Sequence, residues 1–396
     1  MTVLYSILHL LVDGLCAMAM FGRYLPGEHG YFYILLYNFC AFALQMPLGV
    51  LLDALNTRQG CGKGNPDYAY ITAVLGVLCT IAGVVTHPLV LGIGNALFHV
   101  GGGVGTIRED RETNGRGARL GIFVAPGALG LYLGTIAAAG SGTGRMGWSA
   151  CYVSAGIFML ALLFAGKLYL RGYFPKCKTV GLERQENLGG EYGLSYFRPE
   201  SGARRLESDC RESGARGLEN GYGKNSLPLP QTVKGKIVLS VCCLLVVILR
   251  SYIGMNVAFP WKTEALAGIL GVLALVGGKM AGGILAAWKG AFRTAVLSLA
   301  AGAFCYLFSA AMPMGLAALF LFNMTMPVTL YWMVCAFPQM PGFAFGFLTF
   351  ALFLGFLPGY FGMPSLWSGN VHGCVGSVLS LLLLAAGLGK GIRGGQ

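Results

Sequence analysis

Long apolar segments recur along almost the whole chain and constrain its fold more than any other feature. A helix that crosses the roughly 30 Å of hydrocarbon in a bilayer needs about 20 predominantly apolar residues. Charged residues make up only 11% of the 396 residues, so these segments lack the polar faces that helices of a soluble protein need. We therefore predict an all-α integral membrane protein with twelve transmembrane helices, expected at Val3–Tyr24, Tyr31–Leu55, Ala69–Thr86, Leu89–Ile107, Leu120–Ala139, Trp148–Leu170, Lys236–Phe259, Ala265–Trp288, Thr294–Met312, Met314–Ala336, Gly342–Phe361 and His372–Leu388.

A polar stretch, Gly172–Gly235, divides the apolar segments into two groups of six. Its mixed charge, frequent glycine and few large apolar residues give it little to bury, so we expect a flexible tether. It holds a near-repeat, Glu200–Glu207 and Glu212–Glu219, and a docking segment for a partner is the alternative interpretation. The predicted domains are an N-terminal six-helix bundle over 1–171, a cytoplasmic central loop over 172–235 and a C-terminal six-helix bundle over 236–396.

Positive charges lie in alternate connections between the apolar segments. The formal net charge of +12 would suit a nucleic-acid binder, but such a protein gathers its basic residues on one soluble face. Cytoplasmic loops of membrane proteins carry an excess of Lys and Arg of the kind seen here. We therefore predict no nucleic-acid partner, a multi-pass protein of the cytoplasmic membrane, and cytoplasmic N- and C-termini. The residues placed inside are Arg58, Lys63, Arg108, Arg111, Arg116, Arg119, Lys289, Arg293, Lys390 and Arg393, and those placed outside are Arg23, Arg145 and Lys262.

A glycine-acid-basic motif ends the second apolar segment and returns in the second half. The first copy reads Gly49-Val-Leu-Leu-Asp53-Ala-Leu-Asn-Thr-Arg58, and the second reads Gly283-Ile-Leu-Ala-Ala287-Trp-Lys-Gly290-Ala-Phe-Arg293. Glycine permits a close helix crossing, and Asp53 at the membrane face can accept hydrogen bonds from the N-terminus of a neighbouring helix. In this place the motif resembles the loop motif of the major facilitator superfamily, G-x-L-a-D-r-x-G-r-r. The resemblance implies the major facilitator fold, in which two six-helix bundles surround a central cavity and work by alternating access.

A narrower resemblance lies in the first and fourth segments. His9-Leu-Leu-Val-Asp13 and Gly92-Ile-Gly-Asn-Ala-Leu-Phe-His99 are similar to motifs of the fosmidomycin-resistance branch of that superfamily. The branch has a similar histidine-to-aspartate pair and a G-x-G-S-A-x-F-H-P segment. This chain differs from the family patterns where Val100 replaces a proline, Asn56 replaces a glycine and Ala287 replaces the second acid, and the acid that follows the branch segment is absent among Gly101–Gly103.

His9 and Asp13 are four residues apart and therefore share one helix face near the middle of the first segment. An ionisable group at this depth is costly and indicates a function. Asp13 is the only acid in the middle of any predicted segment, so we predict that it carries a coupling proton and that His9 adjusts it. The alternative is that the pair only fixes the first helix. His99 lies beside Gly101–Gly103, where it either meets the substrate or a proton, or bonds a neighbouring helix.

Two basic residues, Arg250 and Lys279, lie deep in the seventh and eighth segments. In the superfamily the first, fourth, seventh and tenth segments line the cavity, and by that resemblance His9, Asp13, His99, Arg250, Asn323, Thr325 and Tyr331 would face one chamber. The substrate-binding candidates are His99, Arg250, Lys279, Asn323 and Tyr331. Two fixed cations against one acid favour an anionic or zwitterionic substrate. Alternatively, Asp13 neutralises one cation and the pair forms a gate between the halves.

The paired halves and the buried charges predict a secondary active transporter. Proton-coupled export of a small organic anion or drug, by an antiporter, is the first expectation, and Gly127, Gly130 and Gly134 partly resemble the superfamily's antiporter signature. Proton-linked uptake, a membrane enzyme, and a non-transporting scaffold or receptor are the alternatives. Catalytic signatures and metal-ligand spacings are missing from the sequence. We therefore predict no enzyme activity, no cofactor, no metal, and a monomer whose partners are a small-molecule substrate, protons and membrane lipid.

Overall fold

The computed structural model describes residues 1–58, 66–140, 155–156, 158–159, 163–164, 166, 230, 232–263, 265–363 and 369–393. Within these ranges the chain is helical and contains no strand, which confirms the predicted all-α fold. The expected sixth segment, Trp148–Leu170, lies largely outside the described residues. So do residues 172–229 of the central stretch, including the near-repeat.

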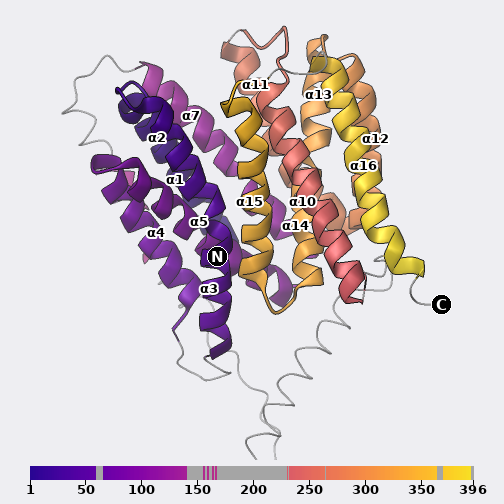
Figure 1. Ribbon diagram of the computed structural model, residues 1–396, viewed down its shortest axis with the longest axis horizontal. Coiled ribbons are helices and arrows are strands. Elements are labelled where there is room, and N and C mark those ends of the chain that lie inside the picture. Colours follow the sequence, from indigo (N-terminus) through magenta and orange to yellow (C-terminus); the bar gives the residue numbers. More distant parts are fainter. Residues whose placement is uncertain are drawn as a thin grey trace, which may run out of the picture.

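The helices of the first half lie together in one group (Figure 1). Within it, α1 packs along α7, and α4 packs along α5. The elements are α1 (Thr2–Ala19), η1 (Met20–Tyr24), α2 (Gly30–Asn38), η2 (Phe39–Ala43), α3 (Gln45–Arg58), α4 (Tyr68–Val85), α5 (Pro88–Glu112), α6 (Ala118–Val124) and α7 (Pro126–Gly140).

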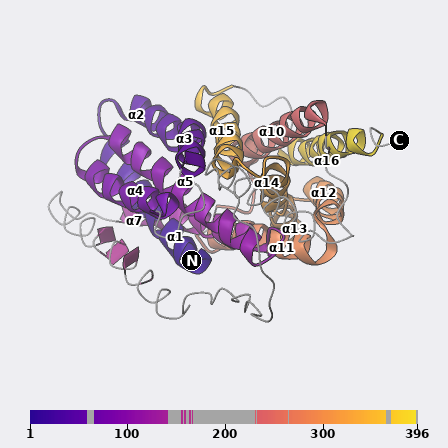
Figure 2. The same ribbon diagram turned by 90° about the horizontal axis from the view of Figure 1, so that it is seen from below.

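The helices of the second half form a separate group beside the first, as the view from below shows (Figure 2). Here α10 packs against α15 and α16, and α12 packs against α13 and α16. The elements are α10 (Val233–Asn256), α11 (Ala265–Lys289), α12 (Ala291–Leu307), α13 (Met312–Asn323), α14 (Thr325–Ala336), α15 (Pro341–Tyr360) and α16 (Gly369–Arg393).

Most of the expected membrane segments correspond to helices of the structure. Ten helical segments of the described ranges are long and apolar enough to cross a membrane, and α12 is a shorter apolar helix. The ninth segment ends earlier than the expected Thr294–Met312, because α12 stops at Leu307 and α13 begins at Met312. Pro313 then falls in the first turn of α13, where its missing N–H group leaves no hydrogen bond unmade.

The second membrane segment is not a regular α-helix. It runs through α2, the π-helical turn η2 and α3 as one apolar span, Gly30–Arg58. Short π-helical turns inside α-helices are frequent at functional sites. Tyr37, Asn38 and Phe42 lie in or next to this turn and line the central cavity. The irregular turn is therefore part of the cavity wall.

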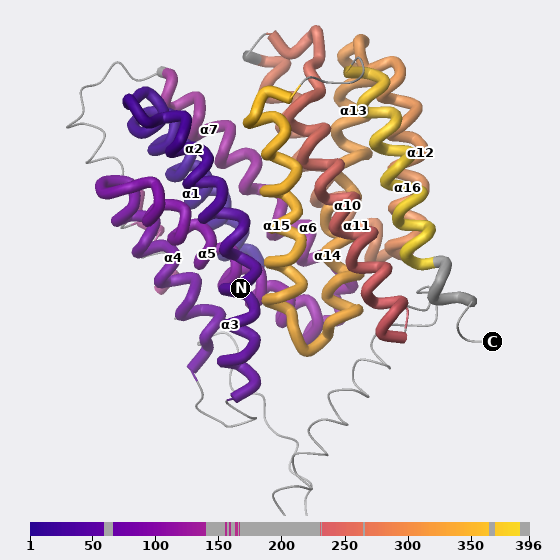
Figure 3. Tube along the Cα trace, in the orientation of Figure 1, coloured from indigo at the N-terminus to yellow at the C-terminus, as the bar shows by residue number. Residues whose placement is uncertain are grey.

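The two halves meet where α3 crosses α15 and where α6 crosses α11 (Figure 3). Glycines lie at both crossings, with Gly49 against Gly342 and Gly121 against Gly283. A Cβ atom at any of these four positions would collide with the backbone of the other half. Glycine is thus what permits the close approach. Both crossings lie toward the end of the molecule that carries Asp53, called the Asp53 end below, and they close the space between the halves there.

Candidate functional site

A cavity of about 450 Å³ lies between the two halves, a size suited to a drug-sized molecule. It extends as far as Lys262, in the segment that follows α10, at the end opposite Asp53. Its wall includes most of the residues expected to meet substrate or proton, namely His9, Asp13, His99, Arg250, Lys279 and Asn323. Apolar side chains lie between them, among them Phe42, Phe259, Phe322 and Phe345.

Tyr331 and Thr325, also expected in the chamber, are not among the residues that line this cavity. Tyr331 is buried, and its ring lies against Gly117. The Thr325 hydroxyl donates a hydrogen bond to the Phe322 carbonyl. Other residues of their helix, α14, do line the cavity, but the side chains of Thr325 and Tyr331 do not.

A polar cluster on the cavity wall is built from two helical i, i+4 pairs. His9 and Asp13 lie one turn apart on α1, and Asn95 and His99 lie one turn apart on α5. His9 Nε2 is 3.2 Å from Asp13 Oδ2, and His99 Nε2 is 3.5 Å from Asp13 Oδ1. Asn95 Nδ2 donates to Asp13 Oδ1 at 3.0 Å. Both carboxylate oxygens of Asp13 therefore already face partners within the first half, not a cation of the second half.

Backbone carbonyl groups hold the two imidazole rings of this cluster. His9 Nδ1 lies 2.7 Å from the Phe123 carbonyl oxygen, and His99 Nδ1 lies 2.8 Å from the Asn95 carbonyl oxygen. The rings meet edge to face, and their Nε2 atoms are 2.8 Å apart. A carbonyl contact at Nδ1 thus fixes each ring, and the Nε2 atoms of the two rings face each other.

Arg250 and Lys279 are the cations of the deep cavity wall. Arg250 is only 7% exposed, and its Nη1 atom has no hydrogen-bond partner among the described residues. Lys279 Nζ lies 3.4 Å from the Val124 carbonyl oxygen. Within the described ranges, no acid lies within salt-bridge distance of either group. The described chain therefore supplies Arg250 with no counter-ion.

The cluster also brings three metal-ligand atoms together. One atom each from His9, Asp13 and His99 lies within 4.8 Å of the others. Two nitrogen ligands of a tetrahedral zinc ion are about 3.3 Å apart, since each Zn–N bond is about 2.0–2.1 Å. The two Nε2 atoms are closer than that, at 2.8 Å, which is a hydrogen-bonding distance. The geometry therefore fits a proton better than a metal ion.

Asp53 joins the two halves at the start of α15. Its carboxylate accepts hydrogen bonds from the backbone N–H groups of Gly342 at 2.9 Å and Phe343 at 2.8 Å. These groups belong to the first turn of a helix, where N–H groups have no partner within the helix and the helix dipole favours a negative charge. The contact is the one that the sequence motif leads us to expect.

The second copy of the motif, which has Ala287 in place of the acid, is arranged differently. Gly283 makes the close crossing with α6, but no carboxylate follows it on α11. The start of α6 is instead held from within its own half by Asp110, which accepts from the N–H groups of Gly117 at 2.8 Å and Arg119 at 3.0 Å. Asp110 therefore does for α6 what Asp53 does for α15, but without linking the halves.

The arginines of the motif lie at the surface. Arg58, at the end of α3, and Arg293, on α12, are exposed. Gly290 precedes α12 with a φ of +94°, in the region that favours glycine. The glycine is thus explained by the turn between α11 and α12.

Hydrogen bonds at both ends of the molecule also join the halves and were not predicted. At the Asp53 end, Arg111 donates to the carbonyl oxygens of Pro338 at 2.6 Å and Val334 at 3.0 Å. At the opposite end, the hydroxyls of Tyr31 and Tyr360 each donate to the other residue's carbonyl oxygen, at 2.6 and 2.9 Å, and the rings stack. Nothing in the sequence pairs tyrosines that are 329 positions apart.

Asn95 was missed as well, although the sequence did hold a signal for it. It precedes His99 by four residues and so shares the helix face of a predicted site residue.

Comparisons with known proteins agree on the fold. No protein-family model matches the chain, and no curated protein matches its sequence. The solved structure of the E. coli fucose:proton symporter FucP covers 97% of this chain and 97% of its own, at 11% identity and a TM-score of 0.55. The human organic anion transporter MFSD10 (TETRAN) covers 98% of each chain, at 15% identity and a TM-score of 0.55. These likenesses show that the chain shares the fold of these two proteins, which confirms the predicted major facilitator fold.

Proposed function

We propose that this protein is a secondary active transporter that carries a small organic anion through the central cavity by alternating access. The observation that carries the proposal is Arg250, a buried guanidinium on the cavity wall with an unpaired Nη1 atom. Such a group is costly inside a membrane unless it meets a partner. A bound anion would supply that partner, and Lys279, which lines the same cavity, would supply a second cation.

The other groups of the cavity support an anion with an apolar body. Asp13, the acid on the wall, is already occupied by His9, His99 and Asn95, so it does not neutralise the cations. The aromatic side chains of the wall offer apolar surface around the charged groups. MFSD10, which shares the fold, is named an organic anion transporter, and this name agrees with the proposal.

Proton coupling through Asp13 and His9 is a further part of the proposal. The two residues lie in the middle of the first membrane span and border the same cavity as Arg250 and Lys279. A proton bound there changes the charge that a substrate meets. The sequence leaves both export and uptake open, and the way in which the proton and the anion affect each other decides between exchange and cotransport.

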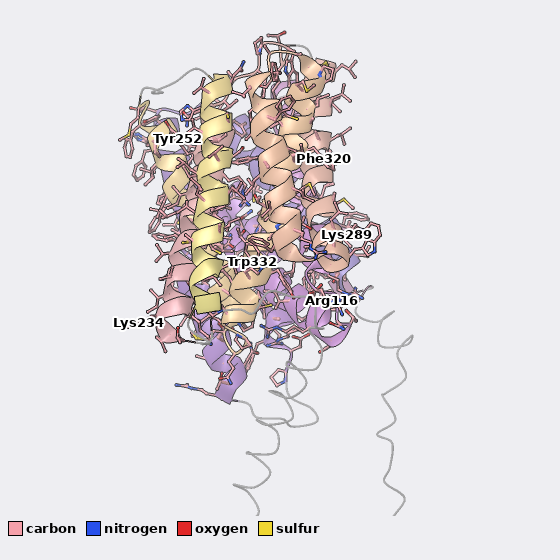
Figure 4. All side chains as sticks on the ribbon, turned by 90° about the vertical axis from the view of Figure 1, so that its right-hand side faces the viewer. Arg116, Lys234, Tyr252, Lys289, Phe320 and Trp332 are labelled. Carbon is pink, nitrogen blue, oxygen red and sulfur yellow. The ribbon has the colours of Figure 1, made fainter. Side chains whose placement is uncertain are left out.

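The orientation that we propose places the Asp53 end in the cytoplasm of a cell membrane, with the chain acting as a monomer. Figure 4 shows Arg116, Lys234 and Lys289 toward one end of the molecule and Tyr252 toward the other. An excess of Lys and Arg in short connections marks the cytoplasmic side. The amino group of Met1 lies 3.3 Å from Glu109, so the N-terminus is at the basic end as well.

The substitution Arg250→Met tests the anion site. We expect transport of small organic anions into proteoliposomes to fall at least about tenfold, because a charged hydrogen bond contributes about 1.5–3 kcal/mol. We also expect the thermal unfolding temperature to rise, because the substitution removes a buried charge that has no counter-ion. A variant that transports a panel of carboxylates as well as the wild type does would contradict the proposal.

A matched pair of lysines on α11 provides the control. Lys279 lines the cavity, whereas Lys289, ten residues later on the same helix, lies over the ring of Trp288 at the surface. Lys279→Gln should reduce anion transport, and Lys289→Gln should leave it unchanged. Equal losses in both variants would show that net charge, and not the cavity site, governs transport.

A further inference from the structure

The backbone contacts of His9 and His99 determine which ring nitrogens carry hydrogen. Each Nδ1 atom faces a carbonyl oxygen, at 2.7 Å for His9 and 2.8 Å for His99. A carbonyl oxygen only accepts hydrogen bonds, so both Nδ1 atoms must be protonated to make these contacts. A neutral imidazole has a single N–H group. If both rings were neutral, both Nε2 atoms would therefore carry only a lone pair.

These two Nε2 atoms lie 2.8 Å apart, which is the distance of a hydrogen bond and not of two facing lone pairs. One hydrogen must lie between them. We propose that His9 and His99 share a single exchangeable proton through their Nε2 atoms, that Asp13 is its fixed counter-anion, and that this proton and the substrate anion bind to the cavity together. The last part rests on the proposed transport function, whereas the shared proton does not.

The position of Asp13 supports this division of roles. Its oxygens lie 3.2 Å and 3.5 Å from the two Nε2 atoms, and Asn95 donates to one of them. A proton placed on Asp13 could satisfy one imidazole, but the two Nε2 atoms would still face each other without a hydrogen. The geometry therefore assigns the proton to the histidine pair and leaves Asp13 as a carboxylate that accepts hydrogen bonds.

The charged and titratable groups around the pair come from several helices. On α1 they are Asp13 and Cys16, on α2 Tyr37, on α10 Arg250 and on α11 Lys279. On the described parts of α6 and α7 the contacts are the Phe123 carbonyl group and Gly127, which carry no charge.

The shared proton adds a positive charge to a wall that already holds Arg250 and Lys279. Repulsion from Lys279 disfavours the proton, and an anion bound to the two cations removes this repulsion. By linkage, the proton must strengthen anion binding by the same factor. A carrier in which proton and anion stabilise each other moves both in the same direction. The arrangement therefore favours proton–anion cotransport over the exchange that the antiporter expectation describes.

Nitrogen NMR of the histidine side chains tests the shared proton without any substrate. The chain has five histidines, so ¹⁵N-labelled protein in nanodiscs, in buffer with a metal chelator, gives few signals. At neutral pH we expect two rings with protonated Nδ1 atoms and one proton distributed over their Nε2 atoms. His99→Gln should abolish this pattern, and His29→Gln, in an outer connection, should leave it intact. Two neutral rings, or a bare Nδ1 atom in either ring, would overturn the proposal.

The coupling to the anion site is tested in the same experiment with the two lysine variants. The substitution Lys279→Gln removes a positive charge, as a bound anion would neutralise it. In this variant the histidine pair should keep its shared proton down to a proton concentration about threefold to tenfold lower than in the wild type. Lys289→Gln should titrate as the wild type does. If Lys279→Gln binds the shared proton no more tightly than the wild type does, the cotransport inference is wrong. Failure of anion transport in the Arg250 experiment would instead overturn the proposed function, while the NMR result on the proton would stand.

Discussion

Gly127 of α7 lies directly against the polar cluster. A Cβ atom built at this position would collide with His9 Nε2 and Asp13 Oδ2. The glycine therefore permits α7 to close over the cluster, and it limits how far the imidazole and the carboxylate can move. A residue that partly resembles an antiporter signature in the sequence thus has a direct steric role at the polar cluster that we propose as the proton site.

We predict that Gly127→Ala reduces anion transport at least about tenfold, because the added methyl group displaces His9 or Asp13 from a geometry in which small shifts are costly. Transport in proteoliposomes and the histidine ¹⁵N spectrum measure the two consequences. Gly254→Ala is the matched control, since Gly254 lines the same cavity and a Cβ atom there meets nothing within 4 Å. If Gly127→Ala keeps wild-type transport and spectrum, the cluster tolerates the displacement and its close packing has no role.

Part of this site follows from helix periodicity. The spacing of His9 and Asp13 places them on one face of a mid-membrane helix, and that holds whatever the neighbours are. The approach of His99 to His9 depends on how α5 packs against α1, which a pattern within one segment does not specify. Tyr331 illustrates the same limit, because its segment reaches the cavity while its side chain packs against Gly117.

At the scale of helices, small residues and caps determine how the halves meet. The motif glycine of each half, Gly49 or Gly283, packs against a glycine of the other half. The two copies differ in the carboxylate, since Asp53 reaches across to α15 and the second copy has alanine. Only the crossing of α3 with α15 therefore has a charged cap that reaches from one half to the other.

We predict that Asp53→Ala loosens the Asp53 end without unfolding either half. The amides at the start of α15 lose two hydrogen bonds to a charged group, so their hydrogen exchange should accelerate at least about tenfold. Exchange followed by mass spectrometry measures this at peptides that contain Gly342 and Phe343. Asp67, which caps α4 within one half, is the control. Asp67→Ala should accelerate exchange only at the start of α4, and equal acceleration at both helices in either variant would contradict the assignment.

The helices themselves were largely predictable, because apolar length in a bilayer leaves few alternatives to a spanning helix. The irregular features were not. The π-helical turns at Met20–Tyr24 and Phe39–Ala43 insert a residue into otherwise regular apolar spans. The first turn contains Gly22 and the second contains neither Gly nor Pro, so no common sequence signal marks the two breaks. The early end of α12 likewise depends on where the chain turns, not on hydrophobicity.

At the scale of the whole molecule, contacts between the halves are distributed unequally over the two ends. The Asp53 end holds the glycine crossings, the Asp53 cap and the Arg111 contacts with the end of α14. Away from that end, the cavity reaches Lys262, and the contact between Tyr31 and Tyr360 links α2 to α15 beside it. The described state is therefore closed toward Asp53 and bridged at one side of the opposite end.

The alternating access that we propose requires this tyrosine contact to break and reform during transport. Tyr31 and Tyr360 stack with their ring centroids 4.3 Å apart, so cysteines at these positions should be joined by a short bifunctional thiol reagent. We predict that cross-linked Tyr31→Cys/Tyr360→Cys protein loses anion transport and that reductive release of the linker restores it. Each single cysteine variant, treated with the same reagent, controls for the native cysteines and should keep its transport. Transport that continues after complete cross-linking would mean that these two ends stay together throughout the cycle, and a mechanism with a fixed connection between α2 and α15 would have to replace the rocking of the two halves.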